Sequence, residues 1–214
     1  MAKQANVVRV DNARHMVVTQ VARLSFPNLF TPKGFQDKPN EAKSFSAHLI
    51  FDSLEDLKKP YNGKKTQTPS LLKAIANAKT DQWGDKERWP RFAYPNVLKG
   101  DDERNKDGEI RNGYEGKVYV KVKSGEKFPP RIVLANGSPA AEADVYGGCY
   151  VQAQILVRPY VTPNAGVSLR LLGIMKVKDG EKFGAGADLF EYEEIDESES
   201  DDWNEDDSDD ASDF

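Results

Sequence analysis

The chain has 214 residues, 38% of them apolar and 30% charged, with a formal net charge of −5 at pH 7. Its single cysteine, Cys149, excludes an intrachain disulfide, and no stretch approaches the roughly 18 apolar residues of a membrane span. The first residues lack the apolar core of a signal peptide, so the sequence predicts a cytoplasmic protein with no membrane segment.

The first half of the chain predicts a polar arm, two strands and one helix. Residues 1–15 are polar and mixed in charge, which is typical of a flexible N-terminal arm. Two segments have the β-branched or alternating pattern of strands: 16–26 and 44–51. Residues 25–35 combine turn-forming residues with three Phe, which is unusual for a simple loop. A capping Ser70 and apolar residues at helical spacing predict a helix ending near Lys79 or Gln82.

The second half predicts a long connection followed by short strands. Residues 83–113 are charged and punctuated by Gly and Pro, and a connection this long inside a compact domain is usually functional. Four strands are expected after it: 117–123, 131–134, 149–157 and 167–175. There is no repeat and no βαβ alternation. The pattern predicts a mainly β domain over residues 16–190, an OB-fold-like barrel of five or six strands with one helix and long loops.

The last 24 residues, 191–214, differ from the rest in charge. They carry 14 carboxylates and no Lys or Arg, so residues 1–190 hold 21 acidic and all 30 basic residues. The body is therefore near +9 and the tail near −14. Low hydrophobicity and dense like charge predict a disordered tail that competes with nucleic acid for a basic surface. The final aromatic suggests capture by a partner through the last residues: Asp209, Asp210, Asp213 and Phe214.

Catalytic and metal-binding motifs are missing from the sequence. Only His15 and His48 are available for acid–base chemistry, and His48 lies in an alternating strand, where a structural histidine is expected. One Cys and two His cannot supply a zinc site, and no phosphate-binding loop or EF-hand spacing is present. The sequence therefore predicts a protein that is not an enzyme and that needs no metal or cofactor.

The strand at 117–123 is the first candidate for nucleic-acid binding. Strict alternation would direct its valines into the core and the other side chains to one outer face: Lys117, Tyr119, Lys121 and Lys123. Such a row would attract phosphates, and a base could stack on the tyrosine. The alternative is the solvated face of an ordinary strand.

Three further segments combine basic and aromatic residues. The basic residues of these segments are expected to contact phosphates: Lys33, Arg88, Arg91 and Arg158. The aromatic residues are expected to stack on bases: Phe30, Phe35, Trp89, Phe92, Tyr94 and Tyr160. Stacking tolerates any base, so the binding would be independent of sequence. For each aromatic the alternative is a structural role, with Trp89, Phe92 and Phe26 filling the ends of the barrel.

Three short segments carry a resemblance to a known family. They read ARLSFPNLF at 22–30, DVYGG at 144–148, and GVSL at 166–169 leading into KDGE at 178–181. The chain resembles phage single-stranded DNA-binding proteins of the type that includes the T7 replication protein. It resembles more closely a phage family formerly of unknown function and later recognised as single-stranded DNA binders.

The resemblance implies an OB-fold and sequence-independent binding of single strands in phage replication, recombination or repair. It also implies tail contacts with a phage or host polymerase and helicase-primase, and a homodimer. Two other classes stay open: an interaction module or DNA mimic acting through its acidic tail, and an RNA-binding or nuclease-associated barrel. Deleting residues 191–214 separates the first alternative from DNA binding, because the tail would be its active surface.

Overall fold

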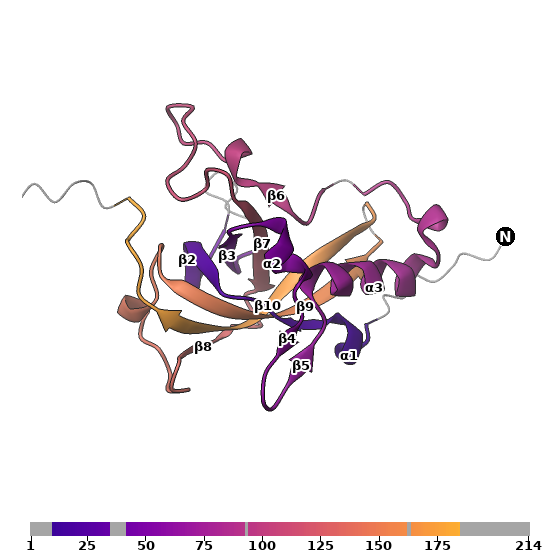
Figure 1. The fold of residues 1–214 in the computed structure, drawn as a ribbon, viewed down its shortest axis with the longest axis horizontal. Helices are drawn as coiled ribbons and strands as arrows, with labels where there is room; N and C mark the ends of the chain where they lie inside the picture. Colours follow the sequence, from indigo (N-terminus) through magenta and orange to yellow (C-terminus); the bar gives the residue numbers. More distant parts are fainter. Residues whose placement is uncertain (1–9, 35–41, 93, 162–163, 185–214) are drawn as a thin grey trace, which may run out of the picture. The chain divides into compact units, whose positions relative to one another are not determined.

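The structure, a computed structural model, describes residues 10–34, 42–92, 94–161 and 164–184 (Figure 1). The chain divides into a compact unit, Met1–Gly184, and a second unit, Ala185–Phe214, so the predicted tail lies outside the described residues. The helices are α1 (Asn12–His15), α2 (Leu54–Lys58), α3 (Leu71–Trp83) and the short 3₁₀ turns η1 (Lys86–Arg88), η2 (Gly100–Asp102) and η3 (Glu142–Asp144). None of these described helices is long and apolar enough to cross a membrane.

The strands form one large sheet and a small hairpin. The strands of the large sheet are β1 (Met16–Val18), β2 (Ala22–Lys33), β3 (Ser44–Phe51), β6 (Leu98–Lys99), β7 (Val118–Gly125), β8 (Arg131–Leu134), β9 (Tyr150–Tyr160) and β10 (Gly166–Lys178). The hairpin pairs β4 (Tyr61–Asn62) with β5 (Gln67–Thr68).

Five strands of the large sheet close into a barrel. The order runs β2, β3, β7, β10, β9 and back to β2, because β9 pairs with both β10 and β2. All neighbours in this circuit are antiparallel except β7 and β10, which are parallel at Lys123 and Arg170. Five strands closed in this way match the OB-fold architecture. The predicted fold class is confirmed: a mainly β, OB-fold-like barrel with few helices.

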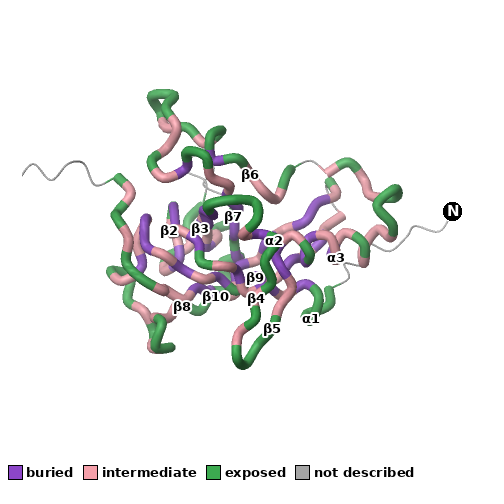
Figure 2. Tube along the Cα trace, viewed as in Figure 1, coloured by how far each residue is buried: buried purple, intermediate pink, exposed green. Residues whose placement is uncertain are grey.

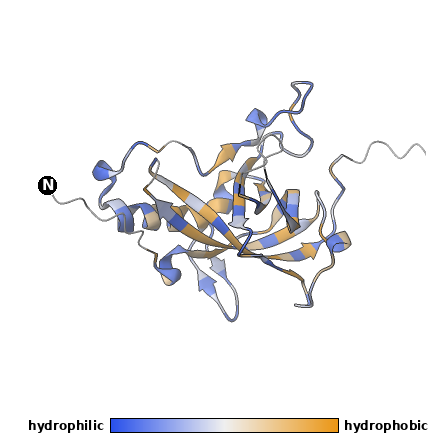
Figure 3. Ribbon diagram, turned by 180° about the vertical axis from the view of Figure 1, so that it is seen from behind, coloured by the Kyte–Doolittle hydropathy of each residue, from blue (hydrophilic) through white to orange (hydrophobic). Residues whose placement is uncertain are grey.

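Alternation along the strands fills the inside of the barrel with apolar side chains. The side chains that face the inside include Ala47 and Leu49 on β3, and Val120 and Val122 on β7, as the valine alternation predicts. Figure 2 shows this buried interior inside exposed connecting loops, and Figure 3 shows that the apolar residues follow the strands. The core therefore sits within the barrel and fixes which side chains each strand turns outward.

Helix α3 packs against β9, β1 and β10. The Ser70 hydroxyl caps it by accepting the Lys73 amide proton at 3.2 Å, as the sequence predicts. The buried face of the helix includes Leu71, Ala74 and Ala78, which join the barrel core. The helix ends at Trp83, just beyond the predicted limit.

The N-terminal part departs from the sequence expectation in two places. Residues 12–15 form α1 instead of a loose arm, because His15 is fully buried and its Nε2 lies 2.9 Å from Asp81 Oδ2. The turn-rich segment after Ser25 continues as β2 to Lys33. It keeps its place in the ladder through a bulge: the pairing jumps from Ser25–His48 to Asn28–Ser46.

Candidate nucleic-acid interface

The outer surface of β2, β3 and β7 is the first place to look for a binding site, because OB-fold barrels bind oligonucleotides on the face of their second and third strands. In the circuit of this barrel those strands are β3 and β7, with β2 beside them. The ladder pairs Ile50 with Tyr119, His48 with Lys121, and Ser46 with Lys123. These pairs point outward and divide the face into a covered half and an open half.

The covered half lies under the segment 98–117, which leads from β6 into β7 (Figure 1). Ile50, Tyr114 and Tyr119 form a second buried cluster here, with Leu98, Ile110 and Phe183 packed around it. The segment is anchored by β6, which pairs Leu98 with Tyr119. We call residues 98–117 the covering segment.

Tyr119 is therefore not an open stacking platform, and that prediction is wrong. Only 4% of the residue is exposed, and the Tyr114 ring lies 5.1 Å away, edge to face. The Tyr119 hydroxyl donates a hydrogen bond of 2.6 Å to Glu103. Burial and this bond raise the pKa of Tyr119. The reason is the covering segment, whose return over β7 the alternation of one strand does not reveal.

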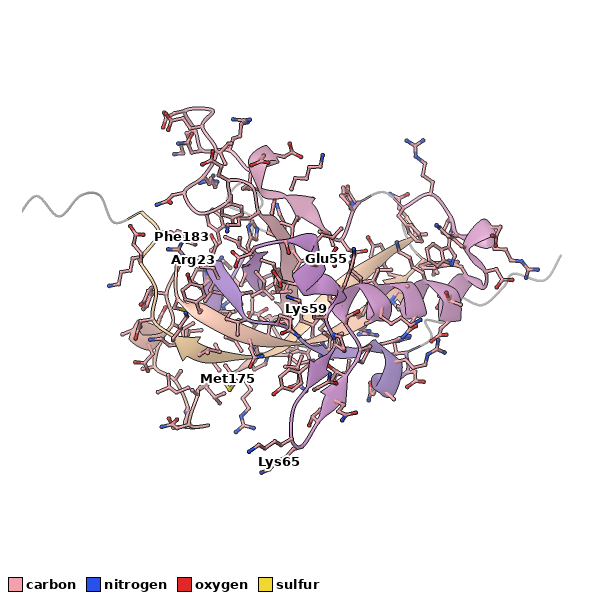
Figure 4. All side chains as sticks on the ribbon, in the orientation of Figure 1. Arg23, Glu55, Lys59, Lys65, Met175 and Phe183 are labelled. Carbon is pink, nitrogen blue, oxygen red and sulfur yellow. The ribbon has the colours of Figure 1, made fainter. Side chains whose placement is uncertain are left out.

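Arg23 fastens the C-terminal end of the compact unit to the covered half. Its Nε donates to the Gly148 carbonyl at 3.2 Å and its guanidinium also donates to the Glu181 carbonyl at 2.7 Å. The same guanidinium lies 4.2 Å from the centre of the Phe183 ring, and Figure 4 shows the two side chains next to each other. Phe183 thus packs against the buried cluster of the covered half together with Tyr114 of the covering segment.

The open half carries the basic residues. It consists of outward side chains of β2, β3 and β7 from the His48–Lys121 pair toward Ser46: Phe26, Asn28, Ser46, Lys121 and Lys123. Phe26 is 43% exposed, and both lysines are exposed. Lys33 is exposed at the end of β2, opposite Ser44.

The open half continues onto β10. Arg170 lies beside Lys123 in the parallel ladder, and its guanidinium lies 4.0 Å from the centre of the Phe128 ring. Phe128 is 55% exposed. Lys123 and Arg170 have no carboxylate within 4 Å in the part of the chain that the structure describes. Their charges are therefore available to an anion.

One carboxylate organises the boundary between the halves. Glu103 Oε1 lies 3.3 Å from Arg111 Nε, and Glu103 Oε2 lies 3.9 Å from Lys121 Nζ. Burial would raise the pKa of Glu103, but the Tyr119 hydrogen bond and the nearby cations outweigh it and lower the pKa. Glu103 thus stays ionised and holds Arg111 above the Phe26 ring, at 5.0 Å from its centre.

His48 has a structural role, as the sequence predicts. Its Nδ1 forms a hydrogen bond of 2.8 Å with the Tyr114 hydroxyl. Burial, followed by the charge of Lys121, lowers the pKa of His48 from 6.5 to about 4. The ring is therefore neutral at pH 7, and it contacts Phe26 edge-on at 5.0 Å.

The aromatic residues after α3 separate into packed and open ones. Trp89 donates its indole proton to the Gly84 carbonyl at 3.0 Å, and Phe92 lies 5.2 Å from Trp83. Lys79 Nζ lies 4.2 Å from the centre of the Phe92 ring. Trp89 and Phe92 are half-buried in this cluster, whereas these neighbours are exposed: Arg88, Arg91 and Tyr94, the last 73% exposed.

The remaining predicted contacts lie on other elements. Arg158 and Tyr160 are half-buried near the end of β9, and a side chain on Gly166 would meet the Tyr160 hydroxyl at 2.1 Å, so the glycine makes room for the ring. Lys117 binds Asp52 at 2.7 Å. Phe30 is half-buried against the core, while Phe35 lies outside the described residues.

The structure therefore brings only Lys121 and Lys123 of the predicted residues together at the centre of the open half, with Lys33 at its end. Three neighbours were not predicted as contacts: Phe26, Arg111 and Arg170. The Phe-Pro pair inside a strand pattern was the available signal for the first, since Pro27 cannot donate to the ladder. Among the described residues no group of three or more His, Cys, Asp or Glu could hold a metal ion.

Solved structures share this fold. The single-stranded DNA-binding protein of bacteriophage Enc34, in complex with single-stranded DNA, superposes with a TM-score of 0.55 at 20% identity, over 86% of this chain and 97% of that one. The single-stranded DNA-binding protein gp2.5 of bacteriophage T7 gives 0.51 at 13% identity, over 83% and 98%. At these identities the likeness establishes the fold.

Sequence comparison identifies the family. A protein described as putative protein p50 of Acyrthosiphon pisum secondary endosymbiont phage 1 is 26% identical over an alignment of 181 residues, which covers 81% of this chain and 90% of that protein. The profile of the family described as the single-stranded DNA-binding protein of Enterobacter phage Enc34 matches residues 15–206. Because that match spans most of the chain, this protein belongs to the Enc34 single-stranded DNA-binding protein family.

Proposed function

We propose that this protein binds single-stranded DNA without sequence preference through the open half of the β2–β3–β7 face. The observation that carries the proposal is the pair Lys123 and Arg170, side by side on the barrel and unpaired with any carboxylate in the described residues. The chain belongs to a family that is described as a single-stranded DNA-binding protein, and this supports the same conclusion. Cations supply affinity for phosphates, and exposed rings supply stacking that any base satisfies.

We further propose that the acidic tail competes with DNA for this surface. The body near +9 and the tail near −14 are joined in one chain, so the tail acts at high effective concentration. DNA displaces the tail, and the released last residues, Asp209, Asp210, Asp213 and Phe214, recruit a polymerase and a helicase-primase. The protein then acts in phage replication, recombination or repair in the host cytoplasm, as a homodimer.

Fluorescence anisotropy of a labelled oligonucleotide tests the proposal. Full-length protein and a 1–190 truncation are titrated against single-stranded DNA, its duplex and the matching RNA, at about 50 and 200 mM salt. We expect salt-sensitive binding that prefers the single strand and tightens in the truncation. The RNA titration decides between DNA and RNA as the ligand.

Matched tail variants separate charge from partner capture. Asp209→Asn, Asp210→Asn and Asp213→Asn together should tighten DNA binding in the direction of the truncation, because they remove competing charge. Phe214→Ala should leave DNA binding unchanged. If neither full-length protein nor truncation binds any oligonucleotide, the proposal fails, and an interaction module acting through its tail takes its place.

A further inference from the structure

Phe26 has a backbone conformation that its residue type disfavours. Its φ is 47°, and it is the only non-glycine residue with positive φ among the described ones. The left-handed region brings Cβ too close to the carbonyl oxygen, and for a bulky residue it is an outlier. The conformation arises at the β2 bulge, where the ladder jumps from Ser25 to Asn28.

The fold gives no reason for an aromatic residue at this bulge. Phe26 is 43% exposed as a residue and does not belong to either buried cluster. Glycine or asparagine would form the same bulge with less strain, since both tolerate positive φ. A strained residue that gains little burial points to a role outside folding.

The contacts of Phe26 fix its ring and leave part of the residue exposed. The ring centres of His48 and Phe26 lie 5.0 Å apart in an edge arrangement, and the Arg111 guanidinium lies over the Phe26 ring, 5.0 Å from its centre, while 43% of the residue stays exposed. Both neighbours are fixed in turn, His48 by Tyr114 and Arg111 by Glu103. The ring is thus preorganised, and the cost of ordering it on binding is small.

The ring also stands next to the cations that would hold phosphates. His48 pairs with Lys121 across the ladder, so Lys121 lies beside the residue that supports the ring, and Lys123 follows two positions along the same strand. An aromatic face next to a row of cations is the arrangement that single-stranded nucleic-acid binders use for stacking.

We propose that Phe26 stacks on a base of the bound single strand, and that its left-handed conformation presents the ring for this purpose. The inference rests on the proposed function and names the stacking position of that site. The strain at residue 26 is kept because it turns the ring out of the barrel, over the open half.

The test uses full-length protein and three variants in the same anisotropy titration with single-stranded DNA. Phe26→Gly removes the ring and fits the positive φ, so the fold should persist, with far-UV circular dichroism and the unfolding midpoint close to those of the parent. Phe26→Tyr keeps a stacking ring. Leu54→Ala is the control, because Leu54 on α2 is also 43% exposed and lies off this face.

We expect Phe26→Gly to weaken binding by about 5- to 150-fold, the range for loss of one stacked base. Phe26→Tyr and Leu54→Ala should bind like the parent. The slope of log affinity against log salt should not change in Phe26→Gly, because stacking releases no counterions.

Three results would overturn the inference and leave the proposed function intact. Phe26→Gly could fold and bind like the parent, or Phe26→Tyr could bind as weakly as Phe26→Gly. The third is a smaller slope of log affinity against log salt in Phe26→Gly than in the parent. If the parent protein itself fails to bind, the proposed function has failed first.

Discussion

The two halves of the β2–β3–β7 face come from the same strands but serve different ends. On β7, Tyr119 is buried, whereas Lys121, two residues later on the same side of the strand, is exposed. The same strands run through both halves. What differs is the covering segment, residues 98–117, which lies over only one of them. Side chains beneath it contribute packing and stability, and those beyond it include exposed cations. Strand alternation thus determines which side of the sheet a residue faces, and the covering segment determines whether that side is exposed to solvent.

The strongest test of this division is Tyr114→Ala in the covered half. Tyr114 is 1% exposed and bonds His48, so its removal leaves a cavity and an unpaired imidazole nitrogen. We expect the free energy of unfolding to fall by roughly 3–5 kcal/mol in urea denaturation. Tyr94→Ala, at a tyrosine that is 73% exposed, should change it by less than about 0.5 kcal/mol. Equal effects would mean that the covering segment is not packed on β7.

The pH dependence of stability tests the boundary at His48. Its pKa is about 4 in the folded protein against 6.5 as the ordinary value, so between these limits the unfolded chain binds a proton that the folded one does not. The free energy of unfolding should therefore decrease as the pH falls from 6.5 to 4, by roughly 3 kcal/mol from this residue. His48→Gln should lose that part of the decrease. Parallel curves for parent and variant would contradict the buried, neutral imidazole.

The smallest expected effect compares Lys117 and Lys123, the two ends of the basic row predicted from the sequence. Lys123 is open and unpaired in the described residues, whereas Lys117 binds Asp52. Lys123→Gln should weaken single-stranded DNA binding several-fold and reduce the salt slope by about 0.7, one phosphate contact. Lys117→Gln should leave both nearly unchanged. If the two variants behave alike, the distinction between open and paired cations fails.

Much of the fold could be predicted from the sequence. The alternating valines of β7, the Ser70 cap of α3 and the long strands β9 and β10 all follow from local patterns, which depend on residues close in the chain. The split between β1 and β2 was missed because it depends on a distant partner: the Thr19 hydroxyl accepts the Ala153 amide proton at 3.0 Å.

The site was harder to predict than the fold. Tyr119 and Lys121 are equivalent in a period-two pattern, and only the tertiary position of Tyr114 distinguishes them. Trp89 and Phe92 look like open aromatics in sequence, but they pack around Lys79. Phe26 was named only as an alternative, filling an end of the barrel, and not as a DNA contact, because a bulge that reverses the direction of one side chain leaves little trace in composition.

The covering segment enters the barrel between β6 and β7 and is anchored at its base, where the Gly100 amide donates to the Lys117 carbonyl at 2.8 Å. A side chain on Gly100 would meet the Tyr114 carbonyl oxygen at 1.9 Å, so the two ends of the segment must stay close together. Between Glu103 and Ile110 the segment forms a largely exposed turn that makes none of the contacts with β7 described above. A change in the length of this turn would alter how far the segment projects from the barrel and leave the packing of Tyr114 and Tyr119 beneath it intact, so the outline of this face can vary while the core stays the same.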